Sequence, residues 1–303
     1  MKIGLMIGTP ATAVVDARQT EQFGFDYVAC GEHLFFHGPV PNSLAVLAAA
    51  AGATSRVRLV SAVTLLPLYP AALVAKLAAT IDAVSGGRFE LGVGAGGEFP
   101  AEFDAAGVDV SARFRRTEEG LRVIRWLFTG EAVTYLGEFA TLTGVALDPP
   151  PMQPAGPPIW LGGRGTGALR RAGRHADVWM PYMVDSAGVR RGLEQVRVTA
   201  ADHGRGPDAV SAALFGWIAV DQDADWARCI GIATVSAAYK QDFTALADRY
   251  LLVGDPSHVT ARLADFAAAG VETVILQIAA TDDADRQRIV NTLAEHLPAL
   301  HNL

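Results

Sequence analysis

Eight short apolar runs, separated by segments of helical periodicity, constrain the fold of this chain more than any other feature. In most runs the apolar residues are consecutive, a pattern typical of strands that are covered on both faces, as in parallel sheets wrapped by helices. The runs are Lys2–Gly8, Phe25–Gly31, Val57–Thr64, Arg88–Gly96, Pro158–Gly163, Asp177–Tyr182, Ser211–Val220 and Val271–Ala279. Eight strands, each followed by a helix, predict an α/β fold of the (β/α)₈ or TIM barrel type.

The intervening segments place apolar residues on one helix face. Such sets are Leu73, Leu77, Ile81 and Val84, then Leu121, Ile124 and Phe128, and later Ile289, Leu293 and Leu297. A doubly wound open sheet is the alternative fold. It would carry a glycine fingerprint in its first strand-to-helix turn, and "IGTPATAV" matches that fingerprint poorly.

Two segments interrupt the regular alternation. Glu131–Gly156 predicts a hairpin and a proline-rich crossing before the fifth strand, and Thr234–Val253 predicts an extra helix after the seventh. Insertions after strands four and seven of a barrel are expected at the C-terminal rim, where active sites are built. With no repeat or linker visible, residues 1–303 are expected to form a single domain.

Composition excludes several classes of function. The net charge is −7 with dispersed basic residues, which argues against a nucleic-acid partner. Cys30 and Cys229 are the only cysteines, so no disulfide framework is expected and a reducing compartment is favoured. No apolar run approaches the roughly 20 residues that span a bilayer, and a buried first strand explains the N-terminus better than a signal peptide. We therefore expect a soluble cytoplasmic protein.

The glycines of "GRFELGVGAGG" raise the question of what their missing side chains allow. Gly92, Gly94, Gly96 and Gly97 fall at the end of the fourth predicted strand. Crowding between strand ends is one explanation. The other is that the backbone lies against a flat ring or a phosphate, where any Cβ would occupy the ligand's space.

A glutamate–histidine pair follows the second strand in "GEHLFFH". Glu32 and His33 are expected at the same rim, with His33 as a hydrogen-bond donor or proton relay. Glu32 would orient that histidine, or would instead make a structural ion pair. A purely structural role for His33 is the alternative.

The fifth strand ends in "WLGGRGTGALRR". Glycines 162, 163, 165 and 167 precede a helix, with Arg164 and Thr166 close by. Unpaired N–H groups and the helix dipole make such a turn an anion site suited to phosphate. An ordinary strand-to-helix turn is the alternative.

Other catalytic motifs are missing from the sequence. No HExxH, CxxC, GxSxG or P-loop occurs, so no metal is predicted and zinc, serine and Walker-type hydrolysis are disfavoured. A lyase or isomerase acting on a phosphorylated metabolite would want a lysine or paired carboxylates at the strand ends. The chain is short of lysine, and Lys76 falls in a helix.

Taken together, the chain resembles the luciferase-like monooxygenase superfamily of flavin- or deazaflavin-dependent barrel enzymes. The resemblance covers essentially the whole chain. Its marks are "GEH", the block "VTLLPLYPAALVAKLAATIDAVSGGRFELGVGAGG", "PPIWLGGRGTGALRRAGRHADVWMP" and "GDPSHVTARLADFAAAGVETVIL".

The resemblance implies roles for the matched positions. His33 would lie beside the ring of the cofactor, with Glu32 where many members have aspartate. Ala62 and Val63 match a position where members often hold a non-proline cis peptide behind the ring. The other expected contacts with the ring and its phosphate are Gly94, Ala95, Gly96, Gly162, Gly163, Arg164, Gly165 and Thr166.

The resemblance also implies an oxidoreductase and its partners. The compact chain favours coenzyme F-420 and hydride transfer to or from a largely apolar organic substrate. Oxygen insertion with reduced FMN is the alternative, and a non-catalytic flavin-binding protein is a third. A glutamate follows the strand-four glycines in many deazaflavin members, but Glu98 is shifted from that place by Gly97. The resemblance and the alanine-rich helices 44–53 and 71–83 predict a homodimer.

Overall fold

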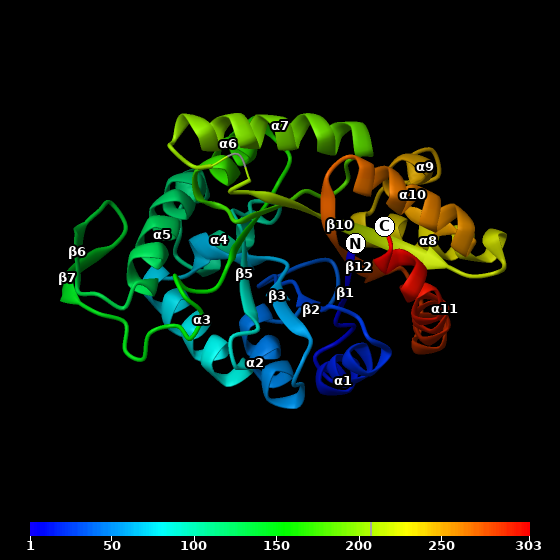
Figure 1. The fold of residues 1–303 in the computed structure, drawn as a ribbon, viewed down its shortest axis with the longest axis horizontal. Helices are drawn as coiled ribbons and strands as arrows, with labels where there is room; N and C mark the ends of the chain where they lie inside the picture. The colour runs from blue at the N-terminus through cyan, green and yellow to red at the C-terminus, as the bar shows by residue number, and fades with distance from the viewer. Residues whose placement is uncertain (207) are drawn as a thin grey trace.

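Eight parallel strands form the centre of the computed structural model, which describes residues 1–206 and 208–303 (Figure 1). Each strand falls within one of the eight predicted runs. They are β1 Lys2–Met6, β2 Tyr27–Cys30, β3 Arg58–Ser61, β5 Phe89–Gly94, β8 Ile159–Gly162, β9 Val178–Met180, β10 Ser211–Val220 and β12 Val271–Ile278.

The sheet closes on itself. Neighbours follow the order β1-β2-β3-β5-β8-β9-β10-β12, and β12 returns to β1, where Lys2 pairs with Thr273. The ring is complete because β9 also pairs with β10, Val178 opposite Ser211. This closure confirms the predicted (β/α)₈ barrel and excludes the open doubly wound sheet.

Helices surround the barrel on its outside (Figure 1). They are α1 Ala13–Phe23, α2 Ser43–Ala53, α3 Ala71–Ser85, α5 Arg113–Phe128, α6 Thr166–His175, α7 Ser186–Asp202, α8 Ala224–Tyr239, α10 Pro256–Ala268 and α11 Asp283–His301. The predicted apolar faces of α5 and α11 are buried, but that of α3 was partly wrong. Leu73 and Val84 are exposed, because Val74, Ala78 and Ile81 pack inward instead.

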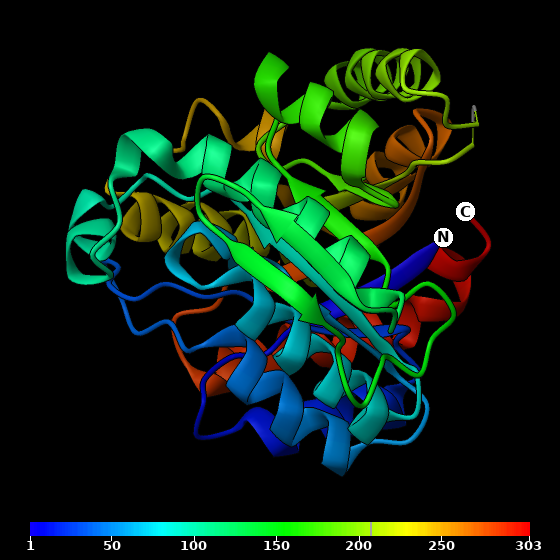
Figure 2. The same ribbon diagram turned by 90° about the vertical axis from the view of Figure 1, so that its left-hand side faces the viewer.

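The first insertion is a hairpin of β6 Val133–Leu136 and β7 Thr141–Val145, as predicted. Its expected position at the active-site rim was wrong. The hairpin stands outside α5 in Figure 1 and faces the viewer in Figure 2. It is held there by the Glu119 carboxylate, which accepts the Phe139 and Ala140 N–H groups at 2.8 Å.

The second insertion lies between β10 and β12. The helix α8 begins at Ala224, before the predicted segment, and the short helix α9 Ala247–Tyr250 and strand β11 Leu252–Gly254 follow it. Four further short elements complete the described structure: β4 Thr64–Leu65, the 3₁₀ turn η1 Leu66–Leu68, α4 Pro100–Ala105 and the 3₁₀ turn η2 Val110–Ala112. Among the described residues, no helix combines the length and apolar character needed to cross a bilayer.

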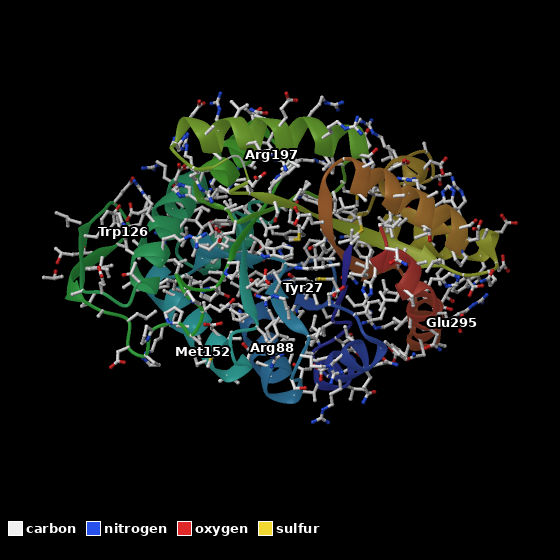
Figure 3. The ribbon with its side chains drawn as sticks, in the orientation of Figure 1. Tyr27, Arg88, Trp126, Met152, Arg197 and Glu295 are labelled. Atoms are coloured by element: carbon white, nitrogen blue, oxygen red, sulfur yellow. The ribbon has the colours of Figure 1, made fainter. Side chains whose placement is uncertain are left out.

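Side chains rather than solvent fill the barrel interior, where Tyr27 is labelled in Figure 3. Met6, Val60 and Met180 are among the buried residues that pack together there. A buried carboxylate, Glu90, accepts hydrogen bonds from the Tyr27 hydroxyl at 3.1 Å and from the Trp160 indole at 2.5 Å. It also pairs with Arg58, so this interior charge is satisfied by the protein itself.

Candidate functional site

A cavity of about 510 Å³ opens at the C-terminal ends of the barrel strands. Residues within or just after all eight strands line it, from Met6 at the end of β1 to Gln277 in β12. Much of the lining is apolar, and α5, α6 and α8 contribute Thr117, Ala168 and Tyr239. A concave, mostly apolar site with a few polar groups is the usual form of a cofactor or substrate pocket.

Most residues predicted for the site come together at this cavity. Three do not line it: Arg164, Gly165 and Thr166. The nine that do are Glu32, His33, Ala62, Val63, Gly94, Ala95, Gly96, Gly162 and Gly163.

His33 is held by a glutamate that sequence reasoning missed. Its Nδ1 lies 3.1 Å from Oε1 of Glu102 in α4, and the Glu102 side chain is fully buried. The same oxygen accepts the backbone N–H groups of Leu34, at 2.6 Å, and Phe35, at 3.2 Å. A carboxylate acceptor at Nδ1 favours the tautomer with the proton on Nδ1, so that Nε2 is free for a ligand. The imidazole stacks on Phe36 with ring centroids 4.4 Å apart.

Glu32 does not orient His33. Its Oε1 accepts the Leu65 N–H at 2.8 Å, and its Oε2 accepts from the Ser43 N–H at 3.1 Å and hydroxyl at 2.8 Å. The carboxylate therefore ties β4 to the N-terminus of α2. Because it is buried and its oxygens are used by the fold, a structural role explains it better than the catalytic role we expected.

The peptide bond between Ala62 and Val63 is cis, as the resemblance implied. It follows β3 at the cavity wall, and Val63 packs against the next strand. A Cβ added to Gly94 would lie 2.6 Å from Cγ2 of Val63, and one added to Gly92 would lie 1.7 Å from the Ser61 carbonyl oxygen. Crowding between β3 and β5 therefore accounts for these two glycines, and clearance for a ring is not needed to explain them.

The next two glycines of the same stretch shape a turn. Gly96 has φ +60° and Gly97 has φ +111°, a region that favours glycine. The backbone that they redirect carries Ala95 and Gly96 along the cavity.

The turn after β8 leads into α6 as predicted. Gly165 caps the helix, and an added Cβ at Gly165 or Gly167 would meet no atom within 4 Å. Within the described part of the chain, no hydrogen bond occupies the Thr166 and Gly167 N–H groups. Arg164 turns away instead: its guanidinium donates to the carbonyl oxygens of Tyr182 and Met183. The N-terminus of α6 is therefore open to a ligand, whereas Arg164, which was expected beside it, is engaged by backbone carbonyl groups elsewhere.

Two further cavity residues form a polar pair. The Tyr182 hydroxyl donates to Oε1 of Glu98 at 2.9 Å, which gives Glu98 a partner across the cavity mouth. Burial and the nearby Glu98 charge raise the pKa of Tyr182 to about 12. Burial likewise raises the pKa of the Cys30 thiol to about 12, so this cavity residue is a neutral thiol and not a nucleophile.

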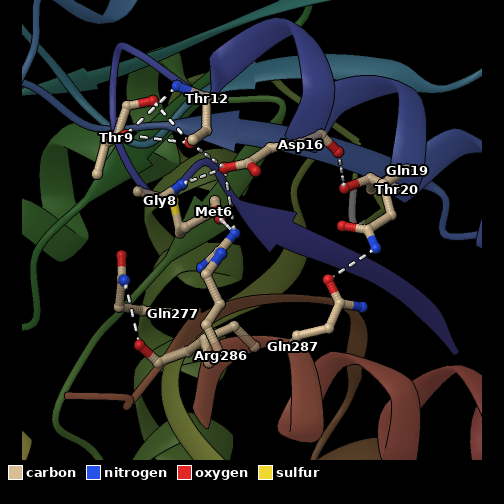
Figure 4. A network of polar contacts seen from close by, with 11 residues as sticks. Met6, Gly8, Thr9, Thr12, Asp16, Gln19, Thr20, Gln277, Arg286 and Gln287 are labelled. Carbon is tan, nitrogen blue, oxygen red and sulfur yellow. Dashed lines mark hydrogen bonds and ion pairs between the residues drawn. The ribbon is translucent and has the colours of Figure 1, made fainter. Parts of the chain in front are cut away.

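An ion pair fixes the cavity edge next to β1 (Figure 4). Asp16 accepts the Gly8 N–H at 2.8 Å and lies 3.5 Å from Arg286, which donates to the Met6 carbonyl oxygen at 3.0 Å. Figure 4 shows Thr12 bonding to the same carboxylate and Gln277 nearby. Because Met6 and Gly8 line the cavity, this network positions the backbone of one wall.

A buried arginine on α6 is the other residue that sequence reasoning missed. Arg171 lines the cavity and is only 8% exposed. The run "ALRRAGRHA" holds three arginines, and helical spacing alone does not say which one faces inward.

The described residues contain no cluster of three or more metal-ligating side chains.

Comparison with known proteins places this geometry in a family. The luciferase-like monooxygenase family model matches residues 4–273. An uncharacterized protein of Mycobacterium tuberculosis is 39% identical over 157 residues, 52% of this chain and 53% of that protein. A phthiodiolone/phenolphthiodiolone dimycocerosates ketoreductase of the same species is 34% identical over 177 residues, 57% of this chain and 46% of that enzyme. The chain thus matches about half the length of these curated relatives.

Solved structures share the whole fold. The monooxygenase RslO1 from Streptomyces bottropensis aligns with a TM-score of 0.83 at 25% identity over 99% of both chains. The coenzyme F420-dependent tetrahydromethanopterin reductase from Methanopyrus kandleri aligns with a TM-score of 0.81 at 20% identity, again over 99% of both chains. An F420-dependent secondary alcohol dehydrogenase aligns at 0.80 and 24% over 99% of this chain and 98% of that one. Relatives in this fold include both oxidoreductases and monooxygenases, and this chain belongs to the luciferase-like monooxygenase family.

Proposed function

We propose that this protein is an oxidoreductase that transfers hydride between coenzyme F-420 and a largely apolar organic substrate. The observation that carries the proposal is the pairing of His33 with the buried carboxylate of Glu102 at the wall of the 510 Å³ cavity. Such a pair is equipped to hold and move a proton at one defined atom, Nε2 of His33.

The residues present suit a phosphorylated, ring-bearing cofactor. The cavity volume of 510 Å³ lies within the ≈ 300–1,000 Å³ that is usual for ligand pockets. The Ala62–Val63 peptide and Gly94–Gly96 would face the ring, and the open N-terminus of α6 would face the phosphate. Coenzyme F-420, when bound, supplies a two-electron hydride donor or acceptor.

The protein's own part in the reaction is to manage the proton. Reduction of a carbonyl group leaves negative charge on its oxygen, and protonated His33 would donate to that oxygen from Nε2. Glu102 holds Nδ1 of His33 and so fixes the plane of the imidazole and the position of its reacting nitrogen, Nε2. In the reverse direction, neutral His33 would accept the proton of an alcohol at the same atom. Apolar neighbours such as Phe36, Val40 and Leu65 favour an apolar substrate and keep water away from this step.

The named relatives support this reading. One is a ketoreductase, and two structural neighbours use F420, one of them as a secondary alcohol dehydrogenase. The 25% identical monooxygenase from Streptomyces bottropensis favours a second candidate, oxygen insertion with reduced FMN. A flavin-binding protein without catalysis is the third, and turnover alone separates it from the other two.

Affinity for the two cofactors tests the proposal. F-420 and FMN are titrated separately into the protein, and the dissociation constant of each is measured by fluorescence. We expect F-420 to bind at least about tenfold more tightly, a difference of about 1.4 kcal/mol. Tighter binding of FMN would favour the monooxygenase candidate.

We also propose that the protein is a homodimer. The outer faces of α2 and α3 present small or apolar exposed residues, including Ala45, Ala48, Leu73 and Val84. Small residues allow two helix faces to approach closely in an isologous interface. Sedimentation at micromolar concentration should give a dimer, and a monomer would reject the proposal.

A further inference from the structure

A buried cation without a partner faces the cavity between α5 and α6. Arg171 is 8% exposed and lines the cavity. Within residues 1–206 and 208–303, no hydrogen bond or ion pair joins its guanidinium to another group, and its Nε is fully buried without a partner. Burial lowers the pKa of Arg171, because the charged form loses solvation there. A charge that is removed from water and left unpaired destabilises the protein unless a ligand of opposite charge pairs with it.

The neighbouring acid, Glu118, makes no ion pair with Arg171 in the described chain, although its charge offsets part of the effect of burial on the pKa of Arg171. Glu118 pairs with Arg174 and lies 3.6 Å from Nε2 of His175. On the other side is Phe114, whose ring centroid lies 5.1 Å from the Arg171 guanidinium carbon and 4.2 Å from that of Arg113. The Nε of Arg113 is also buried without a partner in the described chain. Two guanidinium groups thus lie against one ring, and Arg171 and Phe114 both line the cavity.

The helix that carries Arg171 adds to this positive character. Arg171 lies one turn after Gly167 and Ala168, so it shares their face of α6. Gly163 and Ala168 line the same cavity. The open N–H groups of Thr166 and Gly167 lie at the positive end of the helix dipole. The Arg171 guanidinium therefore belongs to the cavity lining, and the backbone donors lie about one turn before it at the start of the same helix.

We propose that Arg171 binds the phosphate group of the cofactor and is the charged residue of this subsite, in place of Arg164. The inference rests on the proposed function, in which a phosphorylated flavin or deazaflavin occupies the cavity. The residues expected at the ring lie at or just after the ends of β2, β3 and β5, and α6 follows β8, the next strand in the barrel. His33 and Arg171 line the same cavity, so a single ligand that fills it would contact both. The planar guanidinium matches a phosphate with two parallel hydrogen bonds, which a point charge cannot do.

The test compares cofactors with and without phosphate. Dissociation constants for FMN, riboflavin, F-420 and the F-420 core lacking phosphate and tail are measured for wild type and Arg171→Gln. Arg170→Gln is the matched control, because Arg170 is the preceding residue of the same helix and is exposed. Arg171→Gln should weaken FMN and F-420 by about 10–100-fold, the scale of hydrogen bonds to a charged group. Riboflavin and the F-420 core should change less than about twofold, and Arg170→Gln should leave all four unchanged.

Stability without ligand gives an independent readout. If Arg171 is an unpaired cation, Arg171→Gln should leave the thermal midpoint of the ligand-free protein unchanged or raise it. A lowered midpoint with equal losses of FMN and riboflavin would make Arg171 structural and overturn the inference. Unchanged FMN and F-420 affinity, or an equal loss in Arg170→Gln, would also overturn it. Should Arg171→Gln fail to fold, Arg171→Lys keeps the charge and must weaken FMN selectively over riboflavin.

The outcome is separable from failure of the proposed function. If wild type binds none of the four compounds, the proposed function fails, and inorganic phosphate then tests the subsite by itself. Stabilisation of wild type by phosphate, absent in Arg171→Gln, would retain a phosphate site that serves the substrate. No stabilisation of wild type would reject the site.

Discussion

His33 and Glu102 lie 69 residues apart in the chain and 3.1 Å apart in the structure. The histidine follows β2, and the glutamate lies in α4, after β5. Glu102 also accepts the two backbone N–H groups that follow His33, so one buried carboxylate fixes both the side chain and its loop. This relationship fixes the His33 imidazole at the cavity wall, where the proposed function needs an acid–base group.

Replacing His33 with alanine should lower turnover by about 10²-fold or more, the usual contribution of a positioned acid–base group. The thermal midpoint should change little, because His33 is partly exposed. His37→Ala is the control, since His37 is exposed and lies outside the cavity lining. Loss of stability with retained turnover would assign His33 a structural role.

Glu102→Gln separates positioning from folding. The glutamine oxygen can still accept the Leu34 and Phe35 N–H groups, so the protein should fold, whereas its NH₂ group no longer favours a proton on Nδ1 of His33. Turnover should fall by about 10²-fold with KM nearly unchanged, and the nitrogen signals of His33 should report the altered tautomer. An unchanged tautomer and rate would remove Glu102 from the mechanism.

Glu32→Ala should cost more stability than turnover. It removes the acceptor of the Leu65 N–H and of the Ser43 N–H and hydroxyl, all of them buried. The free energy of unfolding should drop by about 3 kcal/mol or more, since each unsatisfied buried donor costs about 1–3 kcal/mol. Denaturant unfolding and turnover per folded molecule are measured together. If the variant is as stable as wild type and its turnover is as low as that of His33→Ala, Glu32 has a catalytic role after all.

Gly92→Ala should destabilise the barrel strongly. The new Cβ would lie 1.7 Å from the Ser61 carbonyl oxygen and would push β3 from β5. We expect a loss of about 3 kcal/mol or more, at the upper end for overpacking. Gly167→Ala is the control: its Cβ meets nothing within 4 Å, and alanine is the better helix former. Equal stability of the two variants would contradict the crowding explanation.

The sequence predicted the barrel well because most strands are runs of largely consecutive apolar residues, a pattern typical of buried parallel strands. It placed His33 correctly because a polar residue directly after such a strand must lie at the C-terminal rim. The sequence did not identify Glu102, because its partner His33 is distant in the chain and no local pattern links the two residues. The sequence did not identify Arg171 for another reason. Three arginines fall within five positions, and only the packing against Phe114 shows which of them is buried.

Two predictions were wrong: the buried face of α3, which was inferred from periodicity alone, and the position of the hairpin, which was inferred from its being an insertion. The face of α3 is set by close packing of Val74 and Ala78, so the larger Leu73 and Val84 remain outside. The hairpin after α5 was expected at the cavity, yet α5 runs back from the cavity toward the opposite end of the barrel. A segment that follows a helix therefore starts far from the site, whereas one that follows a strand starts at it.

Anaerobic turnover separates hydride transfer by F-420 from oxygen insertion by FMN. The oxidation of reduced F-420 is followed without oxygen in the presence of apolar ketones such as cyclohexanone and acetophenone. We expect steady turnover that survives the removal of oxygen and falls by about 10²-fold in His33→Ala. Turnover that occurs only with reduced FMN and oxygen, with none from reduced F-420, would contradict it.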